Sequence, residues 1–126
     1  MRVLIDTDIF IDILREYPPS LKILKGIING KIIGYFSVIS EAELLSGKEC
    51  KQTEKRKAVI ELLSLCTKIK IDNKIAEIAG KLRRNFGVNL DDGFIAATAI
   101  SSKLPLMTRN VKDFKKLPLK VIKPYE

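Results

Sequence analysis

Short runs of apolar, mostly β-branched residues alternate along the chain with longer segments in which apolar residues recur every three or four positions. The first pattern is typical of strands buried in a parallel sheet, and the second is typical of amphipathic helices. Strands are predicted over residues 2–5, 32–39, 67–71, 104–107 and 119–122. The alternation predicts an α/β fold with a central, mostly parallel sheet of about five strands flanked by helices.

Helical periodicity fills the segments between these strands. Asp6, Thr7 and Asp8 are residues that start helices, and the first helical stripe runs to Tyr17, where two prolines stop it. Ser20 and Ser40 are expected to open the next two helices. Further helices are predicted over about 52–65, 73–86 and 94–100, with a final turn around Asp113 and Phe114. No linker or internal repeat divides the chain, so residues 1–126 are expected to form a single domain.

The composition is that of a globular protein, with 46% hydrophobic and 30% charged residues. A net charge of +8 favours a polyanionic partner, although an excess of lysine also serves solubility alone. Cys50 and Cys66 lack the spacing of metal ligands, and we see no leader-like or membrane-spanning apolar segment. These observations favour a cytoplasmic protein.

Histidine is absent from the sequence, and this narrows the possible chemistry. Ser-His-Asp and Cys-His triads, zinc sites with histidine ligands and histidine general bases are all excluded. Any catalysis by this chain must therefore use carboxylates or lysine.

Four polar residues fall where the predicted topology can bring them together. Asp6 follows the first strand, Glu43 lies one turn into the helix after the second, Asp92 starts the helix before the fourth, and Asn110 follows the fourth. Because ligands in parallel sheets bind beyond the carboxyl ends of the strands, we expect these four side chains to share one cleft.

Three carboxylates close together repel one another unless a cation neutralises them. Oxygen ligands without histidine or cysteine suit Mg²⁺ or Mn²⁺, and such ions bind phosphoesters. Each residue also has an ordinary interpretation. Asp6, Asp8, Asp91 and Asp92 can cap helices, Glu43 can be a solvated carboxylate, and Asn110 can end a strand. Asp12, Glu41 and Asp72 are interpreted as surface charges.

Four segments together resemble the PIN-domain ribonucleases, in particular the VapC-type toxins of toxin–antitoxin pairs. They are VLIDTDIFIDIL, SVISEAELLSG, DDGFIAATAI and PLMTRNVKDF, in the order of the family. The resemblance implies a three-layer PIN-like fold and a Mg²⁺- or Mn²⁺-dependent endoribonuclease whose acidic residues are Asp6, Glu43 and Asp92. Asp92 is preferred to Asp91 because two residues and then Ile-Ala-Ala follow it, and Glu43 is preferred to Glu41 because of the Leu and Gly after it.

The sequence departs from the family where many members carry a fourth acid and this chain has Asn110. Asp113 is a weaker candidate for that role, and Thr7, Thr108 and Asp91 are secondary candidates near the same strand ends. Phosphate recognition would fall to Arg109, Lys112, Lys115 and Lys116. The resemblance also implies an RNA substrate, an inhibitory VapB-type antitoxin and a homodimer.

Two alternatives stay open at this point. Asn110 in place of an acid would fit a catalytically idle PIN-like module that binds RNA or protein. Asp6-Thr7-Asp8 after a strand also resembles the motif of haloacid-dehalogenase phosphatases, in which Asp6 would attack phosphate and Asp8 would act as acid and base.

Overall fold

The computed structural model describes residues 1–126 and is built around one five-stranded sheet. The strands are β1 (Arg2–Ile5), β2 (Ile33–Ser37), β3 (Thr67–Ile69), β4 (Leu106–Met107) and β5 (Val121–Ile122). Their order across the sheet is β3-β2-β1-β4-β5, and every neighbouring pair is parallel. The predicted α/β fold is confirmed, with an entirely parallel sheet.

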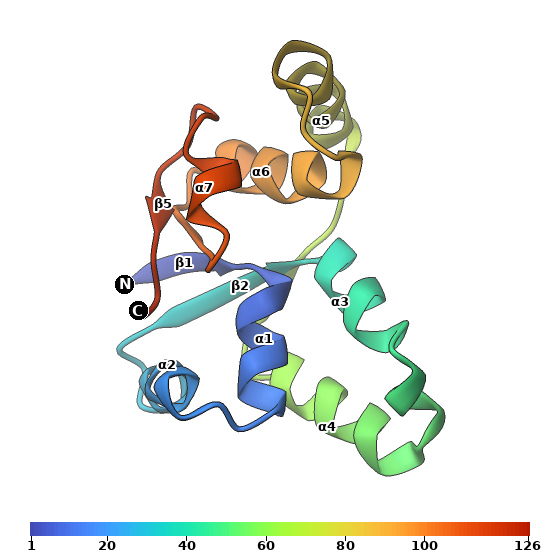
Figure 1. Ribbon diagram of the computed structural model, residues 1–126, viewed down its shortest axis with the longest axis vertical. Helices are drawn as coiled ribbons and strands as arrows, with labels where there is room; N and C mark the ends of the chain where they lie inside the picture. Colours follow the sequence, from blue (N-terminus) through green and yellow to red (C-terminus); the bar gives the residue numbers. More distant parts are fainter.

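Seven helices cover the two faces of this sheet and make a three-layer molecule (Figure 1). Helices α1 (Thr7–Leu14), α2 (Pro18–Ile28), α3 (Val38–Leu45) and α4 (Thr53–Leu63) lie on one face, with a short 3₁₀ turn, η1 (Lys48–Lys51), between the last two. Helices α5 (Asn73–Phe86), α6 (Leu90–Ser102) and α7 (Val111–Phe114) lie on the other.

The central strand β1 explains why both faces must be covered. Its residues alternate between the faces: Val3 and Ile5 pack among the first group of helices, and Leu4 packs among the second. All three side chains are fully buried. On the first face, the rings of Phe10 and Phe36 meet edge to face at 6.1 Å. The apolar run that predicted this strand therefore reflects burial on both sides.

Several helix boundaries differ from the sequence prediction because backbone caps decide them. The first helix ends at Leu14 rather than Tyr17, and α2 begins at Pro18, where proline fits the first turn. Ser20 lies inside α2 and donates to the Tyr17 carbonyl oxygen. Ser37 caps α3 by accepting from the Ile39 N–H, so Ser40 lies within the helix instead of opening it.

Helix α6 also begins earlier than predicted. Its N-cap is Asn89, so Asp91 and Asp92 lie in the first turn and neither is the cap. Helix α6 packs closely on α5 because Gly93 has no side chain: a Cβ there would lie 3.3 Å from the Ala79 carbonyl oxygen. This close contact sets the position of the first turn of α6, and with it the position of Asp92.

The order of the strands places a crevice at one edge of the sheet. Chain connections run from β1 to β2 on one side, whereas β4 pairs with the other side of β1. Neighbouring connections diverge at such a point, and ligands bind there in parallel sheets. Ile5 pairs with Met107, so the residues that follow β1 and β4 are neighbours.

Candidate active site

Asp6 stands at the carboxyl end of β1 and is also the N-cap of α1. One carboxylate oxygen, Oδ1, accepts the Thr7 N–H at 2.8 Å, and the other, Oδ2, accepts the Thr108 hydroxyl at 2.8 Å. Thr108 follows β4 and is fully buried. The register between β1 and β4 therefore fixes the Asp6 carboxylate in one orientation.

Burial raises the pKa of Asp6 to about 7, with a further contribution from the negative charge of Asp8 and a smaller one from Asp92. The hydrogen bonds from Thr108 and Thr7 act in the opposite direction and lower the pKa. Keeping the buried Asp6 carboxylate ionised at neutral pH therefore costs free energy unless a positive charge is bound beside it.

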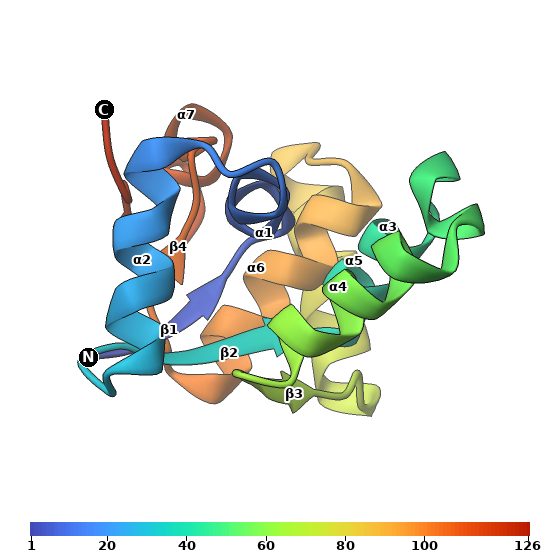
Figure 2. The same cartoon turned by 90° about the horizontal axis from the view of Figure 1, so that it is seen from below.

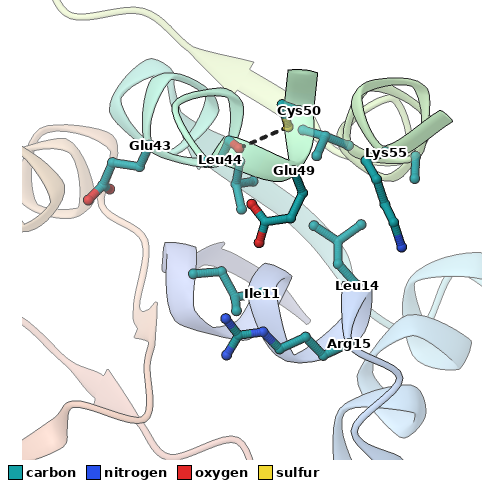
Figure 3. Close-up of a pocket in the computed structure, with 11 residues that line it drawn as sticks. Ile11, Leu14, Arg15, Glu43, Leu44, Glu49, Cys50 and Lys55 are labelled. Atoms are coloured by element: carbon teal, nitrogen blue, oxygen red, sulfur yellow. Dashed lines mark hydrogen bonds between the residues drawn. The ribbon is translucent and has the colours of Figure 1, made fainter. Parts of the chain in front are cut away.

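Glu43 reaches the site from the exposed side of α3. The Thr7 hydroxyl donates to Oε1 of Glu43 at 2.7 Å and forms a hydrogen bond with Oγ of Ser40 at 2.8 Å. Thr7 therefore orients Glu43, and Ser40 supports Thr7 from within α3. Figure 3 shows the Glu43 carboxylate directed away from Leu44, although the two residues are adjacent in the chain.

Asp92 is half-buried in the first turn of α6. Burial raises its pKa to about 6, and the negative charges of Asp91, Asp113, Glu43 and Asp8 contribute in that order. Acids on α1, α3 and α7 are therefore near enough to the first turn of α6 for their charges to act on Asp92. Asp91 itself is exposed.

Asp8 also lies in this region. The sequence alone suggests for it only a capping role, or the role of acid and base in the phosphatase alternative. Its Oδ2 accepts the Arg109 N–H at 3.1 Å and a weaker contact from the Thr108 hydroxyl at 3.3 Å. Its Oδ1 is buried and has no hydrogen-bond partner. Burial raises the pKa of Asp8, opposed chiefly by the charge of Arg109. We call Asp6, Asp8, Glu43 and Asp92 the acidic site.

Asn110 and Asp113 act as a pair at the start of α7. The Asn110 N–H donates to Oγ1 of Thr108 at 2.9 Å, and its amide Nδ2 donates to Oδ2 of Asp113 at 2.9 Å. The Asn110 side chain makes no hydrogen bond to the acidic site. It orients Asp113, whose charge acts on Asp92.

The predicted phosphate-binding residues occupy the segment that follows β4. Lys112, Lys115 and Lys116 are exposed and form no ion pair. Arg109 is also accessible, with 47% of its side chain exposed, but its Nε lies 2.7 Å from Oδ2 of Asp12.

The interpretation of Asp12 as an ordinary surface charge is wrong. Its side chain is only 13% exposed, and its Oδ2 is shared by the Arg109 guanidinium and the Tyr125 hydroxyl. Asp72 is also more than a surface charge, because it caps α5 by accepting the Ile75 N–H at 2.9 Å. Glu41 pairs with Lys68 at the surface, as a solvated acid does.

The donor set is suited to a hard divalent cation. Its ligands are oxygens throughout, and the buried Oδ1 of Asp8 has no proton donor facing it. As they lie in the structure, no three acidic, histidine or cysteine side chains are grouped closely enough to hold a metal ion. Mg²⁺ keeps several water ligands in proteins, and such waters can join it to carboxylates that do not touch it directly.

A groove adjoins the acidic site on the α1 side. It has a volume of about 370 Å³ and lies between α1, α3, η1 and α4. Figure 3 shows Ile11, Leu14 and Leu44 along its wall, with charged side chains at its rim. Glu43 lines this groove as well as belonging to the acidic site, so the two features are continuous.

Comparison with known proteins identifies the fold family. The pattern of the PIN domain matches residues 3–120. The chain belongs to the PIN-domain family. It is 34% identical over 121 residues to Ribonuclease VapC19 of Mycobacterium tuberculosis, an alignment that covers 91% of this chain and 94% of the relative. The resemblance found in the sequence is confirmed, and the PIN fold argues against the phosphatase alternative.

Solved structures agree with this PIN-domain assignment. A toxin–antitoxin complex from Klebsiella pneumoniae contains a chain that is 31% identical, with a TM-score of 0.81 and 98% of both chains covered. A DNA-bound VapBC complex from Salmonella typhimurium matches with a TM-score of 0.84 over 98% of both chains, and at 22% identity it supports the fold alone. No helix of this PIN domain is long and apolar enough to cross a membrane.

Proposed function

We propose that the protein is a Mg²⁺- or Mn²⁺-dependent endoribonuclease that hydrolyses RNA phosphodiesters and acts as the toxin of a VapBC-type pair. The supporting observation is the arrangement of Asp6, Glu43 and Asp92 at the carboxyl edge of a PIN-domain sheet, where their charges act on one region. The related chain from Mycobacterium tuberculosis is named a ribonuclease.

Asp6, Glu43 and Asp92 would hold the cation, with Asp8 beside them. When bound, the cation supplies positive charge that offsets the developing charge of the phosphoester and activates water. The protein contributes orientation: Thr108 fixes Asp6, and Thr7 fixes Glu43. Such hydrogen bonds restrict each carboxylate to one rotamer before any ligand arrives.

The RNA backbone would be bound by the basic residues around β4 and α7. The net charge of +8 provides long-range attraction, and Arg109, Lys112, Lys115 and Lys116 place part of that charge in the segment that follows β4. Aromatic residues make up only 6% of the chain, so stacking on successive bases contributes little to recognition.

Cleavage of structured RNA, such as bulk transfer RNA, tests this proposal with two matched pairs of variants. Glu43→Gln and Asp92→Asn are expected to lower the rate more than about 100-fold, because each removes a proposed cation ligand. Glu41→Gln and Asp91→Asn remove the same charge from the same helices and are expected to retain most activity. EDTA should abolish cleavage, and Mg²⁺ or Mn²⁺ should restore it.

Equal activity of all four variants would contradict the nuclease proposal. RNA binding without cleavage under any metal condition would instead support the catalytically idle module. A large loss in Asp91→Asn alone would reassign the role of cation ligand from Asp92 to its exposed neighbour Asp91.

A VapB-type antitoxin is the proposed protein partner, since solved structures of similar chains are toxin–antitoxin complexes. The groove between α1, α3 and α4 is the proposed contact, because its apolar wall leads to Glu43 and so to the acidic site. Arg15 and Lys55 at the rim suit an antitoxin segment that combines apolar and acidic side chains. If a small reading frame adjoins this gene, co-expression with its product should yield a complex that has lost RNA cleavage.

We further propose that the protein acts in the cytoplasm as a homodimer. Cys50 and Cys66 are both free, which suits a reducing compartment. Exposed apolar side chains such as Ile28, Ile60 and Leu90 are available for contacts between copies. Sedimentation equilibrium measures the mass directly, and a value near 14.2 kDa at all concentrations would show a monomer.

A further inference from the structure

Arg109 is held by two acids that lie on the same face of α1. Asp8 and Asp12 are four residues apart, a spacing that brings side chains to one side of a helix. The Arg109 N–H donates to Oδ2 of Asp8 at 3.1 Å, and the Arg109 Nε lies 2.7 Å from Oδ2 of Asp12. The main chain and the side chain of Arg109 are therefore both fixed against α1.

Tyr125 completes this contact from the far end of the chain. Its hydroxyl group donates to the same Oδ2 of Asp12 that pairs with Arg109. Its ring packs edge to face on Tyr17, with the ring centres 5.6 Å apart. Figure 2 shows the C-terminal end of the chain close to the start of α2, where Tyr17 precedes the helix. Tyr125 lies outside every strand, and these two side-chain contacts, together with packing against the core on the α1 side, hold it in place.

The guanidinium of Arg109 keeps most of its donors free. Arginine carries five N–H donors, and only Nε is engaged, so both terminal nitrogens stay available. The side chain is 47% exposed. Arg109 also follows Thr108 directly, and the Thr108 hydroxyl binds Asp6 of the acidic site. A free fork of donors next to the acids is suited to a phosphate group.

We propose that Asp12 and Tyr125 are positioning residues that hold the Arg109 guanidinium at the edge of the acidic site, where it binds a phosphate group of the RNA substrate. This inference rests on the proposed nuclease function and adds residues to it. A long, flexible side chain loses rotamer freedom when it binds a ligand, and this cost is smaller when the free protein already holds it in place. Tyr125 acts through Asp12, and Asp12 acts through Arg109.

The test compares two tyrosines that each lose one hydroxyl group. Tyr125→Phe removes the hydrogen bond to Asp12, whereas Tyr35→Phe removes a surface hydrogen bond that Arg2 Nη2 makes at 2.7 Å. Dissociation constants for a structured RNA are measured in EDTA, where cleavage is suppressed, and KM and kcat are measured with Mg²⁺. Tyr125→Phe should raise Kd and KM about fivefold and change kcat less. Tyr35→Phe should leave Kd, KM and kcat unchanged.

A double-mutant cycle separates positioning from simple bracing of the fold. Arg109→Gln should weaken RNA binding more than Tyr125→Phe does, and adding Tyr125→Phe to Arg109→Gln should then have no further effect. Asp12→Asn should behave like Tyr125→Phe in the same cycle. Melting temperatures of all variants are recorded, because loss of a brace alone would lower them without changing Kd.

The inference would be overturned if Tyr125→Phe raised the Kd for RNA by the same factor in the wild-type and Arg109→Gln backgrounds. It would also be overturned if the Kd of Tyr125→Phe matched that of Tyr35→Phe. Failure of the proposed function looks different: the wild-type protein would then bind RNA without cleaving it. The binding measurements in EDTA still decide the role of Asp12 and Tyr125 in that case. A wild-type protein that does not bind RNA would overturn both.

Discussion

The Thr108 hydroxyl group joins three segments of the site at one atom. It donates to Asp6 after β1, contacts Asp8 in α1, and accepts the N–H of Asn110 before α7. Because Thr108 is fully buried, water cannot replace any of these partners. At the scale of single residues, the geometry of the site therefore depends on a side chain that the sequence placed only among secondary candidates.

Replacing Thr108 with valine keeps the shape and removes the hydroxyl group. Thr108→Val should lower the free energy of unfolding by about 2 kcal/mol, since the Asn110 N–H and an Asp6 oxygen lose their partner. RNA cleavage should fall as well. Thr98→Val is the matched control: Thr98 is equally buried, but its hydroxyl donates only to the Phe94 carbonyl oxygen within α6. Urea unfolding and RNA cleavage are measured for both variants. Equal free energies of unfolding and equal cleavage rates for Thr108→Val and Thr98→Val would contradict this expectation.

The raised pKa of Asp6 makes the stability of the metal-free protein depend on pH. Its pKa is about 7 in the folded state against 3.8 as the reference value, so the folded state binds the proton more tightly. Stability from this group is therefore complete at low pH and decreases as the pH rises from about 4 to about 7. Asp92, with a pKa of about 6, acts in the same direction.

Asp6→Asn should consequently stabilise the protein in EDTA at pH 8, by about 1–2 kcal/mol after the loss of one hydrogen bond. The gain should vanish below about pH 3, where the wild-type carboxyl group is protonated in both states. Thermal unfolding at the two pH values measures this difference. A stability gain of the same size at both would show that ionisation of Asp6 is not its cause.

Residue roles could be predicted from the sequence only where a local pattern carries them. Asp6, Glu43 and Asp92 each follow a recognisable strand or helix start, and their roles as cation ligands stay predictions. Asp12 and Tyr125 could not be connected, because they are 113 residues apart and Tyr125 lies in none of the four segments that resemble the family. Asp8 was underestimated for the same reason: its partners Thr108 and Arg109 come from the other end of the chain.

At the scale of elements, local capping decides where helices begin and end. The order and type of the main strands and helices follow from hydrophobic periodicity, so they could be predicted. Ser37 and Ser40 are both competent caps, and only the end of the β2 ladder selects Ser37. Strand β4 spans Leu106–Met107 only, because strand length depends on pairing partners that a single segment does not reveal.

Two glycines of helix α5, one inside it and one just after its last residue, show how the effect of a glycine depends on its backbone conformation. Gly87 ends the helix with a φ of 71°, in the left-handed region, whereas Gly80 lies exposed inside it, and a Cβ at either would meet nothing within 4 Å. Gly87→Ala should destabilise the protein by about 1 kcal/mol, and Gly80→Ala should stabilise it by about 0.5–1 kcal/mol. Urea unfolding measures both, and a change of the same sign would contradict the capping role of Gly87.

At the scale of the whole molecule, charge and topology act together. The surplus of 23 basic over 15 acidic residues is spread over the chain, while the acids of the site gather at the carboxyl edge of the sheet. This separation lets a polyanion approach a cluster of carboxylates that would otherwise repel it. The net charge could be read from the composition, but the position of Arg109 beside Asp8 needed the fold.

RNA affinity should fall steeply with salt if this charge arrangement binds the phosphate backbone. Replacing a lysine that contacts a phosphate lowers the slope of log Kd against log salt by about 1. We expect this for Lys115→Gln, at the carboxyl edge. Lys31→Gln should leave the slope unchanged, because Lys31 precedes β2 at the opposite edge of the sheet. Equal slopes for the two variants, measured by titration, would remove the α7 region from the RNA-binding surface.

The hydrogen bond between Asp6 and Thr108 spans 102 residues of the chain. During synthesis, Asp6 is translated well before the strand and the hydroxyl group that orient it. A nascent chain thus carries its carboxylates long before they are assembled. The Asp6 carboxylate is therefore oriented only once the segment that carries Thr108 has been translated.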